Sequence, residues 1–388
     1  MKILHCSDLH LGKKPGGNKR FAETRYQDYF RVFEELIEKI APLEIDVFII
    51  SGDLFDKKEI NANILERTEE LFQKLKAYKP EMSILVIEGN HDVIHRQEDS
   101  WLEYLKNKGY CDVFSYRKDY ESKNVFRKGD IHFYPVGYPG FMVEKTLQDL
   151  AEHLDASQKN IVIVHTAIFG IENLPGLVTA ETIDLFRNKV LYMAGGHVHS
   201  FSAYPKENPY FFVPGSLEYT NIPREKSYQK GAIYFDTDTR EFERILISPR
   251  KRLRTEVFSW ERELESEFES FIRHYAKQEE ELFIIPVNIK SGEYFPIEKL
   301  ESIAERHGIL KVYFEMRENG RAQEKDGEEG YSSLEELEQE IIRSWKLLKN
   351  PERFIRSFSQ LKEFSLEGKQ EELFHLFDEI LEEDEDAD

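Results

Sequence analysis

The segment that decides the fold lies at the start of the chain, where residues 2–12 read KILHCSDLHLG. Residues 2–6 form a short β-prone run, and Asp8 and His10 follow it directly. Four further apolar runs also end in polar side chains that suit a metal ion or a phosphate group. They are 46–50 followed by Gly52 and Asp53, 83–87 followed by Asn90, His91 and Asp92, 160–164 followed by His165, and 190–193 followed by His197 and His199. Ligands of open α/β sheets bind beyond the carboxyl ends of the strands, so we expect the five clusters to converge.

Residues 1–250 alternate these strands with helical patterns, which is typical of an α/β domain. The predicted helices cover 26–40, 62–78, 100–108, 144–154 and 180–186, and further strands are predicted at 131–134, 210–213, 232–235 and 242–247. The last two strands flank the sequence DTDT at 236–239, which favours a hairpin turn.

A second module is predicted at residues 251–320, after a break at Ser248 and Pro249. Its pattern is a helix at 260–278, a strand at 282–289, a helix at 296–306 and a strand at 310–314. Residues 321–330 are polar without apolar periodicity, which indicates a linker. Residues 331–388 are predicted to form helices that end in an acidic tail.

Composition limits the class of protein. The chain has 388 residues with 74 acidic and 53 basic side chains, and its net charge of −21 argues at first sight against a nucleic-acid partner. Cys6 and Cys111 lie in no CxxC pair, so neither a disulfide framework nor a thiolate zinc site is expected. No apolar run approaches the roughly 20 residues that cross a bilayer, and the apolar part of the N-terminus is too short for a signal peptide. We expect a soluble cytoplasmic protein with no membrane partner.

The polar side chains after the strands define the type of metal site. Carboxylate, amide oxygen and neutral imidazole together suit Mn²⁺, Fe²⁺ or Zn²⁺. Seven such ligands are too many for one ion but suit two ions about 3.5–4 Å apart. We expect Asp53 to bridge them, with one oxygen on each ion. The alternating spacing at 8–10 and 197–199 predicts that both polar groups of each pair point to one side, while Leu9 and Val198 point into packing.

These motifs resemble the signature of the calcineurin-like metallophosphoesterase superfamily. The opening segment, GDLF at 52–55 and VPGS at 213–216 are similar to the SbcD-type DNA repair exonucleases within it. The resemblance implies an α/β sandwich of two β-sheets flanked by helices, with a small α/β capping domain and C-terminal helices. It covers residues 1 to about 220 closely and the later domains loosely.

The resemblance also implies a role for each site residue. Asp8, His10 and His199 would bind one metal, and Asn90, His165 and His197 the other, with Asp53 between them. His91 would be the general acid toward the leaving oxygen, helped by Asp92, because a carboxylate can hold the tautomer of a histidine. The reaction would be in-line attack on phosphorus by a hydroxide that the ions generate.

By the same resemblance, the activity would be two-metal DNA cleavage in double-strand-break repair. It would combine a 3′–5′ exonuclease with a single-strand endonuclease, and Mn²⁺ would be the preferred metal. The protein would act as a homodimer together with an SbcC-like coiled-coil ATPase. Two basic clusters are candidates for contacts to the DNA backbone, namely Lys13, Lys14, Lys19 and Arg20 near the metals, and Arg250 and Arg252 at the entry to the second module.

Three alternatives stay open at the level of sequence. The superfamily also hydrolyses small phosphodiesters and phosphomonoesters, so the metal site alone does not name the substrate. The helices after residue 330 either bind the ATPase or pack on their own chain. Many relatives have a histidine where this chain has Asp56, so a second catalytic or DNA-orienting histidine cannot be carried over.

Overall fold

A computed structural model describes residues 1–93, 100–116, 124–170, 174–225, 229–261, 264–275, 282–290 and 292–318, together with 354–355, 357–358 and 376. Contacts divide the chain into two compact units, Met1–Ala322 and Gln323–Asp388. The division falls inside the linker predicted at 321–330. Nearly all of the helical region predicted at 331–388 lies outside the described residues, and the labelled helices and strands all belong to the first unit.

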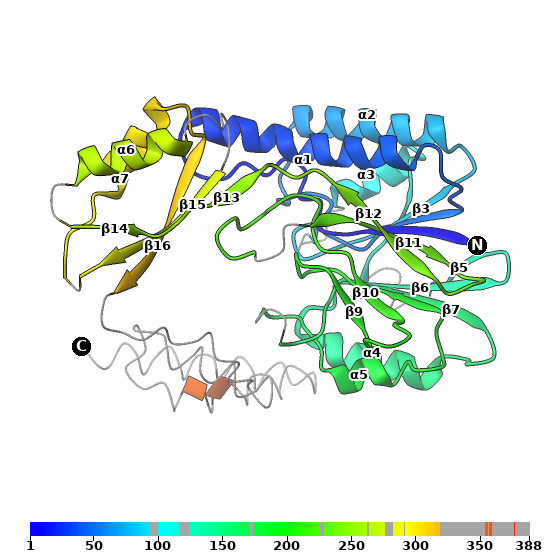
Figure 1. Ribbon diagram of the computed structural model, residues 1–388. Helices are drawn as coiled ribbons and strands as arrows, with labels where there is room; N and C mark the ends of the chain where they lie inside the picture. The colour runs from blue at the N-terminus through cyan, green and yellow to red at the C-terminus, as the bar shows by residue number, and fades with distance from the viewer. Residues whose placement is uncertain are drawn as a thin grey trace. The chain divides into compact units, whose positions relative to one another are not determined.

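The first sheet has six strands in the order β12-β11-β1-β2-β3-β4. These are β1 (Lys2–Cys6), β2 (Val47–Ile50), β3 (Ser83–Ile87), β4 (Asp112–Phe114), β11 (Lys230–Asp236) and β12 (Phe242–Ile247). Strands β1 to β4 run parallel, and β11 and β12 form the predicted antiparallel hairpin, in which β11 pairs antiparallel with β1. The sheet is covered by α1 (Lys19–Ile40), α2 (Ala62–Tyr78) and α3 (Trp101–Asn107) (Figure 1).

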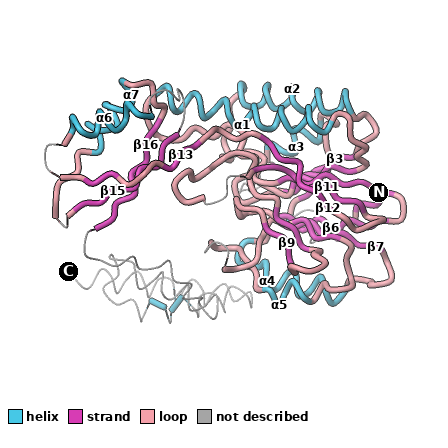
Figure 2. Tube along the Cα trace, viewed as in Figure 1, coloured by secondary structure: helices cyan, strands magenta, loops and turns pink. Residues whose placement is uncertain are grey.

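The second sheet also has six strands, in the order β5-β6-β7-β8-β10-β9. These are β5 (Phe126–Lys128), β6 (Ile131–Gly137), β7 (Lys159–Val164), β8 (Tyr192–Ala194), β9 (Ser202–Tyr204) and β10 (Phe211–Val213). Its outer face carries α4 (Val143–His153) and α5 (Ala180–Asp184), and a short 3₁₀ helix, η2 (Gly140–Met142), precedes α4. Figure 2 shows these helices and those of the first sheet on opposite sides of the paired sheets.

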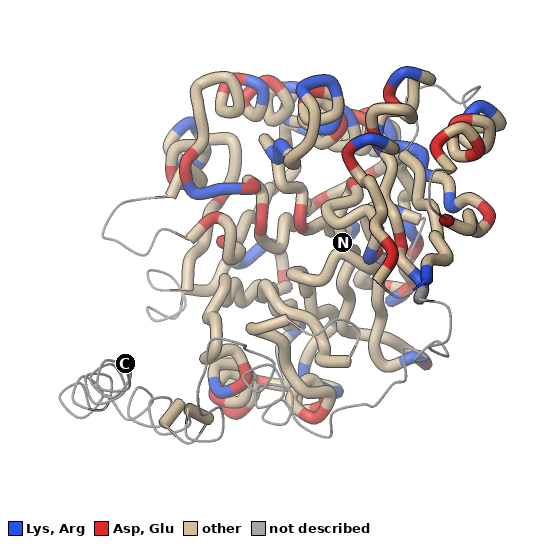
Figure 3. Tube along the Cα trace, turned by 90° about the vertical axis from the view of Figure 1, so that its left-hand side faces the viewer, with Lys and Arg blue, Asp and Glu red and all other residues tan. Residues whose placement is uncertain are grey.

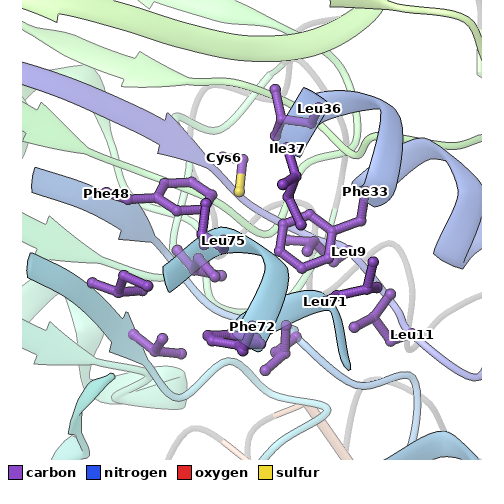
Figure 4. Packing of buried hydrophobic residues seen from close by; sticks show 14 of the residues in the cluster. Cys6, Leu9, Leu11, Phe33, Leu36, Ile37, Phe48, Leu71, Phe72 and Leu75 are labelled. Atoms are coloured by element: carbon purple, nitrogen blue, oxygen red, sulfur yellow. The ribbon is translucent and has the colours of Figure 1, made fainter. Parts of the chain in front are cut away.

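Three apolar layers hold this sandwich together. Phe33, Phe48 and Phe72 belong to the layer between the first sheet and its helices (Figure 4). A second layer packs α4 and α5 on the other sheet, and a third, which includes Ile49 and Phe133, fills the space between the two sheets. Because both faces of the central strands are buried, β1, β2, β3 and β7 are largely continuous apolar runs rather than alternating ones. The predicted two-sheet sandwich flanked by helices is confirmed.

The second module begins after β12 and has its own core. A parallel sheet is built on β15 (Leu282–Ile289), which pairs with β13 (Arg252–Arg254), β14 (Phe258–Ser259) and β16 (Lys311–Glu318). Helices α6 (Glu265–Tyr275) and α7 (Ile297–Arg306) pack on it. Phe21 of α1 packs with Leu282 and Ile284, so the module contacts the sandwich through α1.

Charged residues of both signs are distributed along the first unit. Positions of Lys and Arg alternate with positions of Asp and Glu along the described chain trace (Figure 3). Within the described parts of the chain, no helix has the length and apolar character needed to cross a membrane.

Candidate metal centre

The loops that follow β1, β2, β3, β7 and β8 bring all seven predicted ligands together. Three overlapping groups have ligand atoms that all lie within 4.8 Å of one another, and Asp8, His10 and His199 form the first of them. His10 Nε2 lies 3.2 Å from His199 Nε2, and His199 Nε2 lies 3.8 Å from Asp8 Oδ1. The ligands thus come from both sheets.

A second set gathers around Asn90. Its Oδ1 lies 3.1 Å from His165 Nε2 and 2.9 Å from His197 Nδ1. The other ring nitrogen of His165 donates to the carbonyl of Ser51 at 2.7 Å, and that of His197 donates to the carbonyl of Pro175 at 2.8 Å. These main-chain acceptors fix the tautomer of each ring in its neutral form, so the nitrogen that faces Asn90 is the one that can bind a metal ion.

Asp53 lies between the two sets. Its Oδ2 is 3.5 Å from His165 Nε2 and 3.9 Å from His10 Nε2. Its Oδ1 accepts a hydrogen bond from the backbone N–H of His91 at 2.9 Å. A single oxygen therefore faces both sets, rather than one oxygen for each set as the sequence suggested.

The residues fit divalent cations because carboxylate, amide and imidazole groups converge at one place. Asp8 Oδ1 is buried and has no hydrogen-bond partner among the described residues. Burial raises the pKa of Asp8 to about 6, because the ionised carboxylate is unfavourable away from water. Burial lowers the pKa of His165, but the carboxylate of Asp53 outweighs it and raises that pKa to about 9, so the protein draws positive charge to this point. Metal ions would supply that charge and satisfy the facing lone pairs.

The backbone at the ligands departs from strand geometry. Asp8, His10, Asp53 and His197 all have positive φ, between 48° and 75°. Residues other than glycine rarely adopt this region, and the strain is characteristic of functional sites. Asp8 and His10 do reach one centre, but left-handed turns place them rather than the pleat of a strand. Leu9, predicted to point into packing, is buried.

Two glycines let the ligand loops approach one another. A Cβ on Gly52, which has a φ of 98°, would collide with the imidazole of His165. A Cβ on Gly89 would collide with the side chain and backbone of Asp53. Only glycine fits at either position, as expected for close backbone approach.

His91 lies at the edge of the centre and is 38% exposed at its side chain. Its Nε2 is 4.0 Å from Asp53 Oδ2, and its Nδ1 donates to the main-chain carbonyl of Asp56 at 2.7 Å. The carboxylate of Asp92 instead accepts hydrogen bonds from the backbone N–H groups of Gly89, Leu54 and Phe55. The acceptor that orients His91 is therefore a carbonyl, and Asp92 organises the two ligand loops.

Most of the basic residues predicted to contact DNA are engaged within the protein. Lys13 pairs with Asp56 at 2.6 Å and Lys14 with Glu23 at 3.1 Å. Lys19 and Arg20 are exposed in the first turn of α1, which begins seven residues before the predicted start.

The two arginines at the entry to the module are more deeply engaged. Arg250 binds the buried carboxylate of Asp28, with its Nη2 2.7 Å from Oδ1. Arg252 donates to the carbonyl of Ile222 and lies over the ring of Tyr219. Both join the module to the sandwich, which leaves them poorly placed to bind DNA.

Sequence reasoning missed the residues that support His199. Thr220 Oγ1 contacts His199 Nδ1, and Glu225 accepts from the Thr220 hydroxyl at 2.9 Å. Lys230 donates to the carbonyl of His199 at 2.8 Å and binds Glu225. No spacing marks these residues, because Thr220 and Glu225 lie in a loop, and Lys230 at the start of β11, that the fold brings back to the centre.

Comparison with protein families agrees with this geometry. Residues 1–201, which contain all seven ligands, match the family model described as calcineurin-like phosphoesterase. The chain belongs to the calcineurin-like phosphoesterase family. This family uses a dinuclear metal centre, and the two ligand sets that flank Asp53 are the candidate centre in this member. The superfamily predicted from the motifs is confirmed.

Curated relatives of this calcineurin-like phosphoesterase include DNA repair proteins. The DNA double-strand break repair protein Mre11 of Methanococcus maripaludis is 27% identical over 252 residues, covering 59% of this chain and 60% of the relative. The protein of the same name from Methanosarcina mazei is 23% identical over 325 residues, covering 80% of this chain and 49% of its own. The chain thus spans about half the length of the curated relatives it matches. Among solved structures, a dimetal phosphatase from Danio rerio aligns with a TM-score of 0.40 and 9% identity, over 60% of this chain and 91% of its own.

Proposed function

We propose that this protein is a metal-dependent DNA nuclease that binds two divalent ions, and that Mn²⁺ is the preferred metal. The observation that carries the proposal is the convergence of candidate metal ligands on both sides of Asp53, with His165, His197 and His199 each held by a protein oxygen on the outer ring nitrogen. Asp8, His10 and His199 would hold one ion, and Asn90, His165 and His197 the other. Asp53, which lies between the two sets, would be shared by both ions. Bound there, the ions would neutralise charge on the phosphate and favour ionisation of the attacking water.

His91 is the proposed general acid. Its Nδ1–H group stays hydrogen-bonded to the carbonyl of Asp56. The proton that His91 transfers is therefore carried on Nε2, the nitrogen that faces the centre. The imidazolium gives this proton to the leaving oxygen of the phosphodiester. A partly exposed ring can exchange the proton with solvent after each turnover.

We propose DNA as the substrate because the two curated relatives described above are DNA double-strand break repair proteins. The proposed action is 3′–5′ exonuclease cleavage of duplex DNA together with endonuclease cleavage of single strands. The proposed assembly is a homodimer in the cytoplasm with an SbcC-like ATPase, bound through residues 331–388. Loss of ATPase co-purification after truncation at Gly330 would support this partner, and unchanged binding would exclude this route.

A specific observation favours the alternative of smaller phosphodiester or phosphomonoester substrates. Three of the basic residues predicted to contact DNA, Lys14, Arg250 and Arg252, are engaged with acidic groups, a carbonyl or an aromatic ring of the protein. A small ester would depend less on such cations than a DNA backbone does.

Hydrolysis assays separate these functions. The protein with Mn²⁺ or with EDTA would be given linear duplex DNA labelled at either end, circular single-stranded DNA and bis(p-nitrophenyl) phosphate. The proposal predicts Mn²⁺-dependent shortening from 3′ ends and opening of the circle. Hydrolysis of the chromogenic ester alone would favour the alternative, and inactivity on every substrate would overturn the phosphoesterase proposal. Asp53→Ala is the matched inactive control.

A further inference from the structure

Asp56 lies against the metal centre at a point where three functional side chains meet. Its Oδ1 is 2.6 Å from Lys13 Nζ and 3.4 Å from His10 Nδ1, and its main-chain carbonyl accepts from His91. Asp56, His10 and His91 form one of the three groups whose ligand atoms lie within 4.8 Å of one another. The residue is 8% exposed, so its carboxylate is fixed by these neighbours rather than by solvent.

The backbone holds this arrangement in register. Leu11 pairs with Phe55 in a parallel bridge, and Leu11 N donates to the carbonyl of Leu54. Asp56 N donates in turn to the carbonyl of Leu11. The segments after β1 and β2 thus run side by side, which places the side chains of residues 10, 13 and 56 together.

Lys13 is in a position to act on a bound substrate. A turn bond from Lys13 N to the carbonyl of His10 keeps it three residues from a candidate ligand. Its side chain is 22% exposed, so part of it reaches solvent at the rim of the centre. An ammonium has three donors, and a bond to Asp56 leaves others for a phosphate oxygen. Because the carboxylate already fixes the flexible stem, less side-chain entropy is lost when a phosphate binds.

His10 has a complementary need. Its Nε2 faces His199 and Asp53, and its Nδ1 is buried without a hydrogen bond among the described residues. A cation on Nε2 makes the Nδ1 proton a stronger donor, and a carboxylate on that side stabilises the ring as a ligand. Asp56 Oδ1 lies on that side of the ring.

We propose that Asp56 positions His10 as a metal ligand and holds Lys13 as a cation that binds a non-bridging oxygen of the substrate phosphate. This inference rests on the proposed function and adds a substrate-binding residue to it. It also gives a role to the position where many relatives have a histidine.

Two substitutions separate the two parts of the proposal. Lys13→Gln should raise KM for duplex DNA by roughly tenfold, with kcat and Mn²⁺ affinity unchanged, because it removes one charged contact to phosphate. Lys13→Arg should restore most of the KM. Asp56→Asn should weaken Mn²⁺ binding in calorimetry by about ten- to hundredfold and also raise KM. Lys159→Gln, from an exposed pair with Asp130 at the start of β7, is the matched control.

Each contrary outcome has a separate meaning. If wild-type protein cleaves DNA and Lys13→Gln has a normal KM, Lys13 does not bind the substrate. If Asp56→Asn folds by circular dichroism and binds Mn²⁺ as wild type does, the positioning role is wrong, and Asp56→Ser would serve if Asp56→Asn does not fold. If wild-type protein binds Mn²⁺ but hydrolyses neither DNA nor the chromogenic ester, the proposed function fails and the substrate role of Lys13 fails with it.

Discussion

At the scale of single residues, three histidines of the centre are oriented through the ring nitrogen that points away from it. His165 and His197 donate to the carbonyls of Ser51 and Pro175, and His199 contacts the hydroxyl of Thr220. Such outer contacts select the tautomer and orient the ring before any ion binds. The ligands are therefore preorganised by the fold.

His91 should be separable from metal binding. We expect His91→Ala to keep both ions and to lose hydrolysis by about a hundredfold to ten-thousandfold, as for removal of a general acid. Elemental analysis of bound metal and steady-state hydrolysis of DNA would measure the two effects. His153→Ala, on the exposed side of α4, should change neither. A parallel fall in metal content would show that His91 is a ligand and not the proton donor.

His5 joins the two sheets and should make stability depend on pH. Its ring contacts Tyr192 and Ser51, each at 2.7 Å, and burial lowers its pKa to about 3. In the unfolded chain the pKa returns to about 6.5, so the unfolded state binds more protons between these values. The stability that depends on neutral His5 is therefore present above pH 6.5 and is lost as the pH falls toward 3.

Urea unfolding in EDTA would measure this loss against His5→Gln. From about pH 7.5 to about pH 5.5, wild type should lose about 1.4 kcal/mol more than the variant, since one pKa unit corresponds to about 1.4 kcal/mol. Equal losses would mean that His5 is not kept neutral by burial.

At the scale of elements, a buried ion network joins α1 to the loop before the second module. Asp28 of α1 binds Arg25 and Arg250, and Arg25 also lies 3.2 Å from Glu218. Arg25, Asp28 and Glu218 are each at most 1% exposed. Removal of one partner reduces the compensation of a buried charge, which is costly.

Arg250→Gln should therefore change stability and leave DNA binding intact. We expect the free energy of unfolding to fall by about 3 kcal/mol. The salt dependence of DNA binding should keep its slope, whereas loss of a phosphate contact would lower the slope by about one unit. Arg187→Gln, from an exposed pair with Asp184, is the control for stability. A lower slope with unchanged stability would restore Arg250 as a DNA contact.

Element by element, the sequence predicts long and apolar segments well. Strands β1, β3, β12 and β15 and helix α2 have the predicted bounds. The two- and three-residue strands β4, β5, β9, β13 and β14 were missed, because so few residues show no periodicity. Helix α1 begins at Lys19, where Asn18 caps it, and so starts before the predicted residue. The sequence pattern missed this first part because Arg25, which is buried through ion pairs, stands where an apolar residue is expected.

The candidate site follows the same rule at the level of its residues. Residue type and order along the strands were enough to name the seven side chains that the structure brings together. Left-handed backbone at Asp8, His10, Asp53 and His197 could not be foreseen, because it depends on contacts between loops. The partners of Asp92 and the support from Thr220 and Glu225 depend on tertiary contacts in the same way.

At the scale of the whole molecule, the net charge of −21 is unevenly distributed. Residues 331–388 carry 17 acidic and 7 basic side chains, so this region supplies much of the excess. The centre itself combines carboxylates with a cluster of imidazoles and the ammonium of Lys13. The average charge is therefore a poor guide to the partner. An enzyme of this kind would hold DNA through its metals and a few local cations, and through its proposed ATPase partner.

The central claim is that two divalent ions bind on either side of Asp53. Anomalous diffraction from crystals grown with Mn²⁺ tests it most directly. We predict two manganese peaks, one bounded by Asp8, His10 and His199 and the other by Asn90, His165 and His197, with Asp53 ligating both. A single peak, or peaks that do not contact Asp53, would contradict it.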